Sequence, residues 1–398
     1  MNIIEQIIQQ KNDGRKVIIY CAGLHGKLFY SVLKTCGILV DFFADMDSCK
    51  WGKDIADGIP CINPERLNEW DSIGFICVGK VYYQEIYELI CREKWFEIIE
   101  ISSIIDELIL NNRALYFDVL RSHAKQKSAD LFYDLYPNKT SIEVNVNKTS
   151  IEVNAKKIDR RKEKEKVAIY TAVFGGYDST CFPRYINHTM DYFYVSDERP
   201  RDLPVYFHWV DAGTIIPDSI TSPVKRNRFI KMNPHLFLKD YVYSMYIDGN
   251  VIIKGDVSSF ICKSKTGISL FMHPMRECIY YEALSIVNFK RVNVDDVCRQ
   301  MNRYLEEGMP YRYGLAEMPV IVREHGKKEC VDVMETWWRE FDRESQRDQL
   351  SFMYALWKNN FNLNDLAILG NNVRKCEQIE FCHHVAENRD VKNDLVRN

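Results

Sequence analysis

The sequence lacks several features that would assign it to a well-defined class. No two of its 13 cysteines stand in a Cys-x-x-Cys spacing, which argues against a zinc ribbon or a thioredoxin-like redox site. No run approaches the roughly 20 apolar residues that span a bilayer. The first ten residues lack the basic start of a signal peptide. We therefore expect a cytoplasmic protein without a transmembrane segment, able to lie at the periphery of the inner membrane.

An excess of charge of one sign is also missing. The formal net charge is -3, and 27% of residues are charged against 46% that are apolar. Such a balance is ordinary for a globular protein. It gives no basis for non-specific binding of nucleic acid, so we expect no nucleic-acid partner. A chain of 398 residues is long enough for roughly two or three domains.

Residues 1–110 have the alternating pattern of a small parallel α/β domain. A buried strand at 17–21 leads into a glycine turn at Gly23 and Gly26, then a helix, then a strand that ends at Asp45. This order follows the logic of a dinucleotide-binding fold. The fingerprint is incomplete, because Cys21 stands where the first glycine is expected. We expect a structural or regulatory Rossmann-like module here, with an active nucleotide site as the alternative.

The motif in this first domain also carries a resemblance. Residues 22–26, together with Asp45 and Asp47, resemble the Rossmann-like domains at the front of sugar-modifying acyltransferases and of bacterial glycan enzymes. Residues 111–166 follow as a helical and charged linker. They contain a tandem nine-residue repeat within 138–154 and a mixed charge run at 156–166, which is typical of a solvated segment. A second domain is expected at 167–390.

The stretch 241–256 is the centre of that second domain. It reads as a strand, a polar break of Asp248, Gly249 and Asn250, and a second strand. Buried strand ends that carry such oxygens need a partner, and a hydrated divalent cation holding a diphosphate would be one. The alternative is a plain hairpin turn, because Asp-Gly is a strong hairpin signal.

Two other segments of this domain have features of an anion site. Gly175 and Gly176 directly follow a strand and would let the backbone approach a ligand closely, or simply form a tight turn. A helix then carries Lys225, Arg228 and Lys231 on what we expect to be one face. A solvated helix face and a diphosphate-binding face are both open interpretations.

A series of sequence blocks resembles a known family. In order along the chain, the blocks are residues 170–178, 225–231, 246–250, 273–280, 322–325, 337–338 and 347–352. They are similar to the bacterial branch of a glycosyltransferase-like family whose plant members include turgor-regulation and mucilage-pectin proteins. The resemblance covers about half of the chain, from 167 to about 365. It implies an α/β fold of the GT-A type, which transfers sugars from nucleotide-diphospho-sugars.

The resemblance also implies roles for individual residues. Asp248 and Asn250 would hold a divalent cation, Mn²⁺ or Mg²⁺, although Asn250 replaces the second acid of an Asp-x-Asp motif. Glu317 and Asp348 are the candidate catalytic acids. The expected donor-binding residues are Thr171, Phe174, Gly175, Gly176, Tyr177, Asp178, Lys225, Arg228, Asp248, Asn250, His273, Arg276 and Gln349.

Some of these residues have ordinary explanations that the sequence leaves open. His273, Arg276 and Glu317 can each take part in a salt bridge or a cap. Asp348 opens a helix, where a carboxylate stabilises the dipole. We expect a glycosyltransferase that moves a sugar from a nucleotide-sugar donor to a glycan or lipid-linked acceptor in surface polysaccharide synthesis. The alternative is a non-catalytic nucleotide-sugar-binding or scaffolding protein of a glycan pathway. A third hypothesis is an oxidoreductase that uses the first domain.

Overall fold

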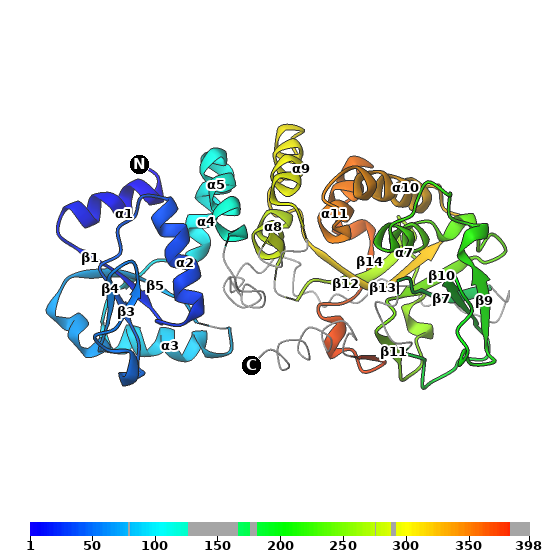
Figure 1. The fold of residues 1–398 in the computed structure, drawn as a ribbon, viewed down its shortest axis with the longest axis horizontal. Coiled ribbons are helices and arrows are strands. Elements are labelled where there is room, and N and C mark those ends of the chain that lie inside the picture. Colours follow the sequence, from blue (N-terminus) through cyan, green and yellow to red (C-terminus); the bar gives the residue numbers. More distant parts are fainter. Residues whose placement is uncertain (79, 126–165, 176–180, 275, 288–291, 383–398) are drawn as a thin grey trace. The chain divides into compact units, whose positions relative to one another are not determined.

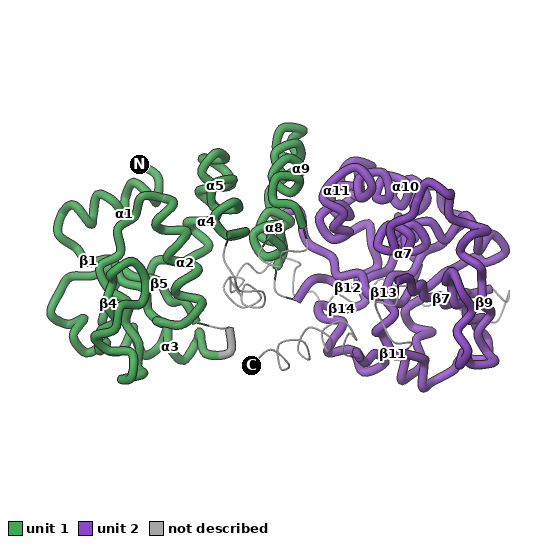
Figure 2. Tube along the Cα trace, in the orientation of Figure 1, with its two compact units in different colours: residues 1–143, 275–312 green, residues 144–274, 313–398 purple. Residues whose placement is uncertain are grey.

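The computed structural model describes residues 1–78, 80–125, 166–175, 181–274, 276–287 and 292–382. The chain divides into two compact units, which Figure 2 colours separately: residues 1–143 with 275–312, and residues 144–274 with 313–398. These bounds differ from the predicted ones. The first unit extends past residue 110, and it also contains the segment 275–312, which the sequence places in the second domain. The tandem repeat and nearly all of the charge run lie outside the described residues.

The first unit is built on a six-stranded sheet in the order β3-β4-β2-β1-β5-β6 (Figure 1). All neighbouring strands are parallel except β3 and β4. The strands are β1 (Lys16–Tyr20), β2 (Phe42–Ala44), β3 (Asp54–Ala56), β4 (Ile59–Ile62), β5 (Ser72–Ile76) and β6 (Glu97–Ile98). The helices are α1 (Ile3–Asn12), α2 (Leu24–Thr35), α3 (Lys80–Glu93), α4 (Ile101–Asn111), α5 (Arg113–Ala124), α8 (Ile279–Ile286) and α9 (Val294–Glu306).

The turn between β1 and α2 keeps a glycine-like geometry around a cysteine. Cys21 has a φ of 96°, a conformation that costs a non-glycine residue free energy. At the end of β2, Asp45 accepts hydrogen bonds from the Ala22 amide at 2.8 Å and from Lys50 Nζ at 2.9 Å. Burial alone would raise the pKa of Asp45, but these bonds hold it below its ordinary value. The carboxylate is thus engaged by the protein itself, which favours a structural role for this turn.

We predict a large effect for Gly26→Ala in this turn. A Cβ atom at Gly26 would lie 2.0 Å from the Cys21 carbonyl oxygen, and backbone atoms cannot move aside as a flexible side chain can. The unfolding free energy of the first unit should fall by about 3 kcal/mol, measured by calorimetry. Gly326→Ala, where no heavy atom outside the neighbouring residues lies within 4 Å of the added Cβ, should leave the thermal unfolding transitions unchanged. Equal transition temperatures for both variants would contradict the packing argument.

The segment 275–312 is bound to the first unit by specific contacts. The Tyr116 hydroxyl donates to the Tyr280 carbonyl at 2.8 Å. Asp106 of α4 accepts from the Tyr281 hydroxyl at 2.5 Å and pairs with Arg312 at 2.8 Å. The sequence could not reveal this insertion, because these partners are far apart in the chain.

The second unit contains a seven-stranded sheet in the order β14-β12-β13-β10-β7-β8-β9 (Figure 1). β10, β7, β8 and β9 run parallel, and β13 runs antiparallel to both of its neighbours. The strands of this sheet are β7 (Val167–Ala172), β8 (Asp191–Ser196), β9 (Phe207–Asp211), β10 (Tyr243–Ile247), β12 (Ile268–Met272), β13 (Ala316–Glu324) and β14 (Ala367–Gly370). A separate pair is formed by β11 (Val251–Ile253) and β15 (Ile379–Phe381). The helices are α7 (Pro223–Met232), α10 (Lys328–Arg343) and α11 (Asp348–Lys358).

Strand pairing tests the hairpin interpretation of the stretch 241–256. A hairpin would pair β10 with β11, but β10 pairs with β7 and β13, and β11 pairs with β15. The hairpin interpretation is therefore excluded. Met245 and Ile247 face an apolar core, whereas Tyr246 faces Lys231 of α7. This alternation leaves Asp248 at the carboxyl end of a central strand.

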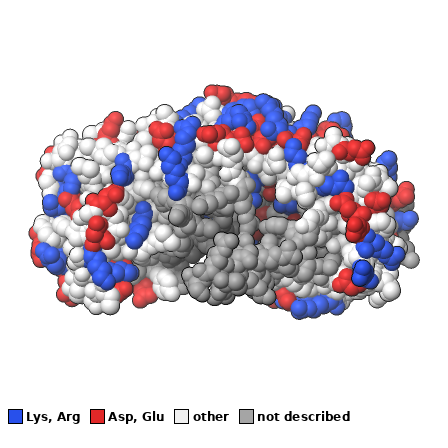
Figure 3. Space-filling view, viewed as in Figure 1, with Lys and Arg blue, Asp and Glu red and all other residues white. Residues whose placement is uncertain are grey.

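The predicted α/β architecture, with a parallel-rich sheet in each half, is confirmed. On the face that Figure 3 shows, basic and acidic side chains are interspersed, in keeping with the small net charge. Within the described part of the chain, no helix is both long and apolar enough to cross a membrane.

Candidate functional site

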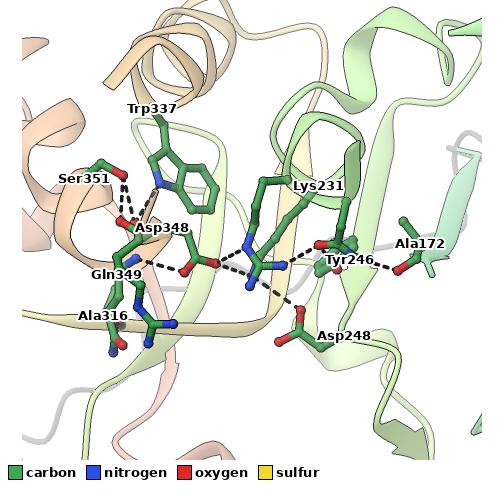
Figure 4. A network of polar contacts seen from close by, with 12 residues as sticks. Ala172, Lys231, Tyr246, Asp248, Ala316, Trp337, Asp348, Gln349 and Ser351 are labelled. Atoms are coloured by element: carbon green, nitrogen blue, oxygen red, sulfur yellow. Dashed lines mark hydrogen bonds and ion pairs between the residues drawn. The ribbon is translucent and has the colours of Figure 1, made fainter. Parts of the chain in front are cut away.

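A network of charged side chains lies at the carboxyl end of β10 (Figure 4). Lys231 Nζ lies 3.4 Å from Asp248 Oδ1 and 3.0 Å from Asp348 Oδ2. Arg228 Nε lies 2.9 Å from the same Asp348 oxygen. The four residues come from α7, the end of β10 and the start of α11. Ligand sites of parallel α/β sheets collect at such strand ends.

Helix α7 presents two of its three predicted cations to this network. The helix begins with Pro223 at its first turn, a position where the missing amide hydrogen costs nothing. Arg228 and Lys231 are three residues apart and share a face. Lys225 lies outside the network, because its ammonium pairs with Asp342 of α10 at 2.6 Å.

The network is buried on one side and open on the other. The side chain of Lys231 is 2% exposed and that of Asp348 15%, whereas Asp248 is 30% exposed. Burial alone would raise the pKa of Asp348. The positive charges of Arg228, Lys231 and Arg347 outweigh burial and hold that pKa well below its ordinary value. Asp348 is therefore a permanent anion at neutral pH, and Lys231 is held between two carboxylates.

The start of α11 is fixed by several hydrogen bonds. The Trp337 indole donates to the Asp348 carbonyl at 2.9 Å, and the Ser351 hydroxyl donates to it at 3.2 Å. Gln349 donates through Nε2 to the Ala316 carbonyl at 3.3 Å. Asp348 lies in the first turn of the helix, as the sequence predicts, but its carboxylate also serves as the partner of two distant cations.

Sequence reasoning missed Asn227 as a member of the site. Its amide donates to the Ala172 carbonyl at the end of β7 at 2.7 Å. Its carbonyl oxygen accepts from Arg228 and, at 3.5 Å, from the Tyr246 hydroxyl. Asn227 thus ties α7 to two strand ends, those of β7 and β10. In the sequence Asn227 lies between two arginines within the block 225–231, which could have marked it.

The structure describes part of the segment 171–178, which contains six of the predicted donor-binding residues. Thr171 is buried near the end of β7, and Phe174 is buried with the Arg226 guanidinium 5.4 Å above its ring. Gly175 has a φ of 67°, and a Cβ there would lie 3.0 Å from Pro223, so this position requires glycine. Gly176, Tyr177 and Asp178 lie outside the described residues.

The ends of β12 and β13 place two further candidates in the second unit. His273 is buried, and its amide donates to the Leu315 carbonyl at 2.9 Å. Glu317 pairs with Phe271 across the two strands. Two residues further along β13, the Pro319 carbonyl accepts from the Asp248 amide at 2.8 Å. The backbone of Glu317 therefore lies beside the strand end that carries the network.

Arg276 is a further predicted donor-binding residue. It belongs to the first unit, where its guanidinium forms a buried ion pair with Glu282 at 2.6 Å. The ordinary alternative for Arg276, a salt bridge, is the one that the structure shows.

A resident divalent cation fits this arrangement poorly. Asp248 is the single carboxylate of the expected pair, and it already contacts Lys231. The Asn250 side chain lies 3.5 Å from the Cys382 carbonyl, and the Cys382 amide donates to the Asn250 carbonyl at 2.8 Å. In the part of the chain that the structure describes, no group of three or more His, Cys, Asp or Glu side chains could hold a metal ion. These residues do not form a cage for Mg²⁺ or Mn²⁺.

Several solved structures have a low similarity to parts of this chain. The apo structure of the bifunctional glycosyltransferase WbbM shares 12% identity over 52% of this chain and 39% of its own, with a TM-score of 0.32. The galactosyltransferase LgtC, in complex with donor and acceptor sugar analogues, shares 10% identity over 52% of this chain and 74% of its own, with a TM-score of 0.30. The Rex-family repressor RSP shares 18% identity over 28% of this chain and 66% of its own, with a TM-score of 0.19. TM-scores this low support no functional conclusion.

The matched stretch of sequence covers parts of both units, because it includes the segment 275–312 of the first. No curated protein matches this chain. The matched family model is described as "TOD1/MUCI70, glycosyltransferase-like domain" and spans residues 220–385, less than half of the sequence. This range contains Arg228, Lys231, Asp248 and Asp348, so the residues that build the charged network are those that resemble a glycosyltransferase-like domain.

Proposed function

We propose that the second unit is a glycosyltransferase with a GT-A-like site, which moves a sugar from a nucleotide-sugar donor to a glycan or lipid-linked acceptor in surface polysaccharide synthesis. One observation carries the proposal: the glycosyltransferase-like match encloses a charged network at the carboxyl end of a central strand. The cytoplasmic location expected from the sequence is part of the proposal.

The network suits a leaving group that carries a diphosphate. Arg228 is 26% exposed, and a guanidinium can bind two phosphate oxygens at once. Lys231 adds a compact positive charge behind it. Positive groups fixed where negative charge develops lower the barrier to departure of the nucleoside diphosphate. We assign this neutralisation to Arg228 and Lys231, the two cations that Asp348 holds at the strand end. Phe174 and Gly175 would lie along the nucleoside.

The acids take different parts in this proposal. Asp348 already forms ion pairs with Arg228 and Lys231. We therefore propose that Asp348 orients these two cations. Glu317 is the proposed base that takes the proton of the acceptor hydroxyl. Asp248, more exposed than Asp348, would accept a hydrogen bond from a hydroxyl of the donor sugar. Gln349 and His273 are proposed to line the donor sugar.

The test is release of nucleoside diphosphate from a panel of UDP-sugars and GDP-sugars, with and without Mn²⁺. We expect at least one donor to be hydrolysed slowly without an acceptor. Asp248→Asn should reduce that rate about 100-fold, with little change in thermal stability. If no donor is turned over and none raises the melting temperature, the proposal is wrong.

One observation favours the alternative of a non-catalytic nucleotide-sugar-binding protein. Asp248, the one carboxylate at the two positions expected to hold the cation, is already paired with Lys231. Under this alternative, a donor would bind and stabilise the protein but would never be turned over, with or without added acceptor. The same panel therefore separates the two functions, because binding and nucleoside diphosphate release are measured on the same samples.

A further inference from the structure

Strand β13 carries a guanidinium in the interior of the second unit. Arg323 is 0% exposed, and no carboxylate among the described residues is paired with it. Its guanidinium donates to the Lys231 backbone carbonyl and, at 3.0 Å, to the Tyr170 hydroxyl. The Tyr170 hydroxyl in turn donates to the same Lys231 carbonyl at 3.0 Å.

A buried cation is costly unless its charge is met. Helix α7 ends at Met232, so the Lys231 carbonyl lies in the last turn, where carbonyls lack helical partners and the helix dipole is negative. The Tyr170 ring adds a negative face 5.6 Å from the guanidinium carbon. The helix end and the tyrosine thus stabilise Arg323, and Arg323 fixes the helix end.

Arg323 binds the backbone carbonyl of Lys231. The side-chain ammonium of the same Lys231 contacts Asp248 and Asp348. Arg323 therefore sets the backbone from which Lys231 reaches the charged network. We propose that Arg323, with Tyr170 as an intermediate, is a positioning residue for Lys231 in donor binding. This inference rests on the proposed function. In the sequence Arg323 directly follows the apolar run 320–322 and precedes Glu324 and His325, so its burial could not be predicted.

The experiment measures binding of UDP and GDP by calorimetry to the full chain. Arg323→Lys keeps the charge but cannot reach both partners, and Kd for the nucleotide that binds should rise about tenfold. Tyr170→Phe removes one hydroxyl and should raise Kd about threefold. Val322→Ala is the matched control, because Val322 is buried on the same strand but packs into the apolar core. It should destabilise the unit and leave Kd unchanged.

A double-mutant cycle separates positioning from a general structural role. If Arg323 acts through Lys231, the effect of Arg323→Lys on Kd should disappear in a Lys231→Met background. Equal losses in both backgrounds, or no loss in either, would overturn the inference. Should Arg323→Lys fail to fold, the same cycle is run with Tyr170→Phe.

A crystal structure of Arg323→Lys gives a readout that does not depend on the proposed function. We expect Lys231 Nζ to leave hydrogen-bonding distance of Asp348, where it now lies at 3.0 Å. An unmoved Lys231 would contradict the positioning role. If neither nucleotide binds the unsubstituted protein, the proposed function fails, and this structure alone decides the role of Arg323.

Discussion

Asp348→Asn is expected to lower the free energy of unfolding by about 3 kcal/mol at pH 7. The substitution keeps the size of the side chain but removes the anion that Arg228 contacts at 2.9 Å and Lys231 at 3.0 Å. Two neighbouring cations would then share one neutral amide. Urea denaturation of the second unit measures the loss. Asp342→Asn is the control, because the Asp342 side chain is 46% exposed, and exposed ion pairs contribute less than about 1 kcal/mol.

The pH dependence of this loss has a definite sign. The neighbouring cations hold the pKa of Asp348 well below its ordinary value. A carboxylate with a lowered folded-state pKa contributes stability that is fully present above its unfolded pKa, about 3.9, and is lost as pH falls below it. The difference between wild type and Asp348→Asn should therefore shrink by about 1 kcal/mol between pH 7 and pH 3. A difference that stays constant would show that the carboxylate is not the stabilising group.

Lys231→Met is expected to reduce donor turnover, as kcat/KM, by about 100-fold. The ammonium is the most buried group of the network, so water cannot replace it when the diphosphate binds. Methionine has a similar length and suits the buried site, which keeps the fold intact. The measurement is nucleoside diphosphate release at several donor concentrations, together with a melting curve.

Lys225→Met provides the matched control for this effect. Lys225 lies on the same helix but pairs with Asp342, and its loss should change kcat/KM less than threefold. Equal losses for the two variants would restore the donor-binding role that the sequence suggests for Lys225. They would also show that general positive charge, and not the position of Lys231, supports the reaction.

The limits of sequence reasoning are visible on helix α7. The spacing of Lys225, Arg228 and Lys231 predicts one basic face. With 3.6 residues per turn, the first and last members of such a run point roughly 120° apart. Lys225 therefore reaches α10, while Lys231 reaches the strand end. Local spacing predicts neighbours correctly and becomes less reliable over two turns.

Long-range pairings explain the other differences. The sequence places Asp348 at a helix start, but its contact with Lys231 joins residues 117 positions apart. Arg276 follows His273 by three positions, yet the chain has by then entered the first unit. Strand ends are easier to predict, because an apolar run and its terminating polar residue are adjacent in sequence. That is why Asp248 and Gly175 could be identified in advance, and Asn227 and Arg323 could not.

A crystal structure of the full chain with a UDP-sugar or GDP-sugar tests the central claim most directly. We expect diphosphate oxygens within hydrogen-bonding distance of Arg228 and Lys231, with the nucleoside beside Phe174 and the sugar facing Asp248. A donor bound elsewhere, for example at the β1–α2 turn of the first unit, with the Lys231–Asp348 network untouched, would contradict it.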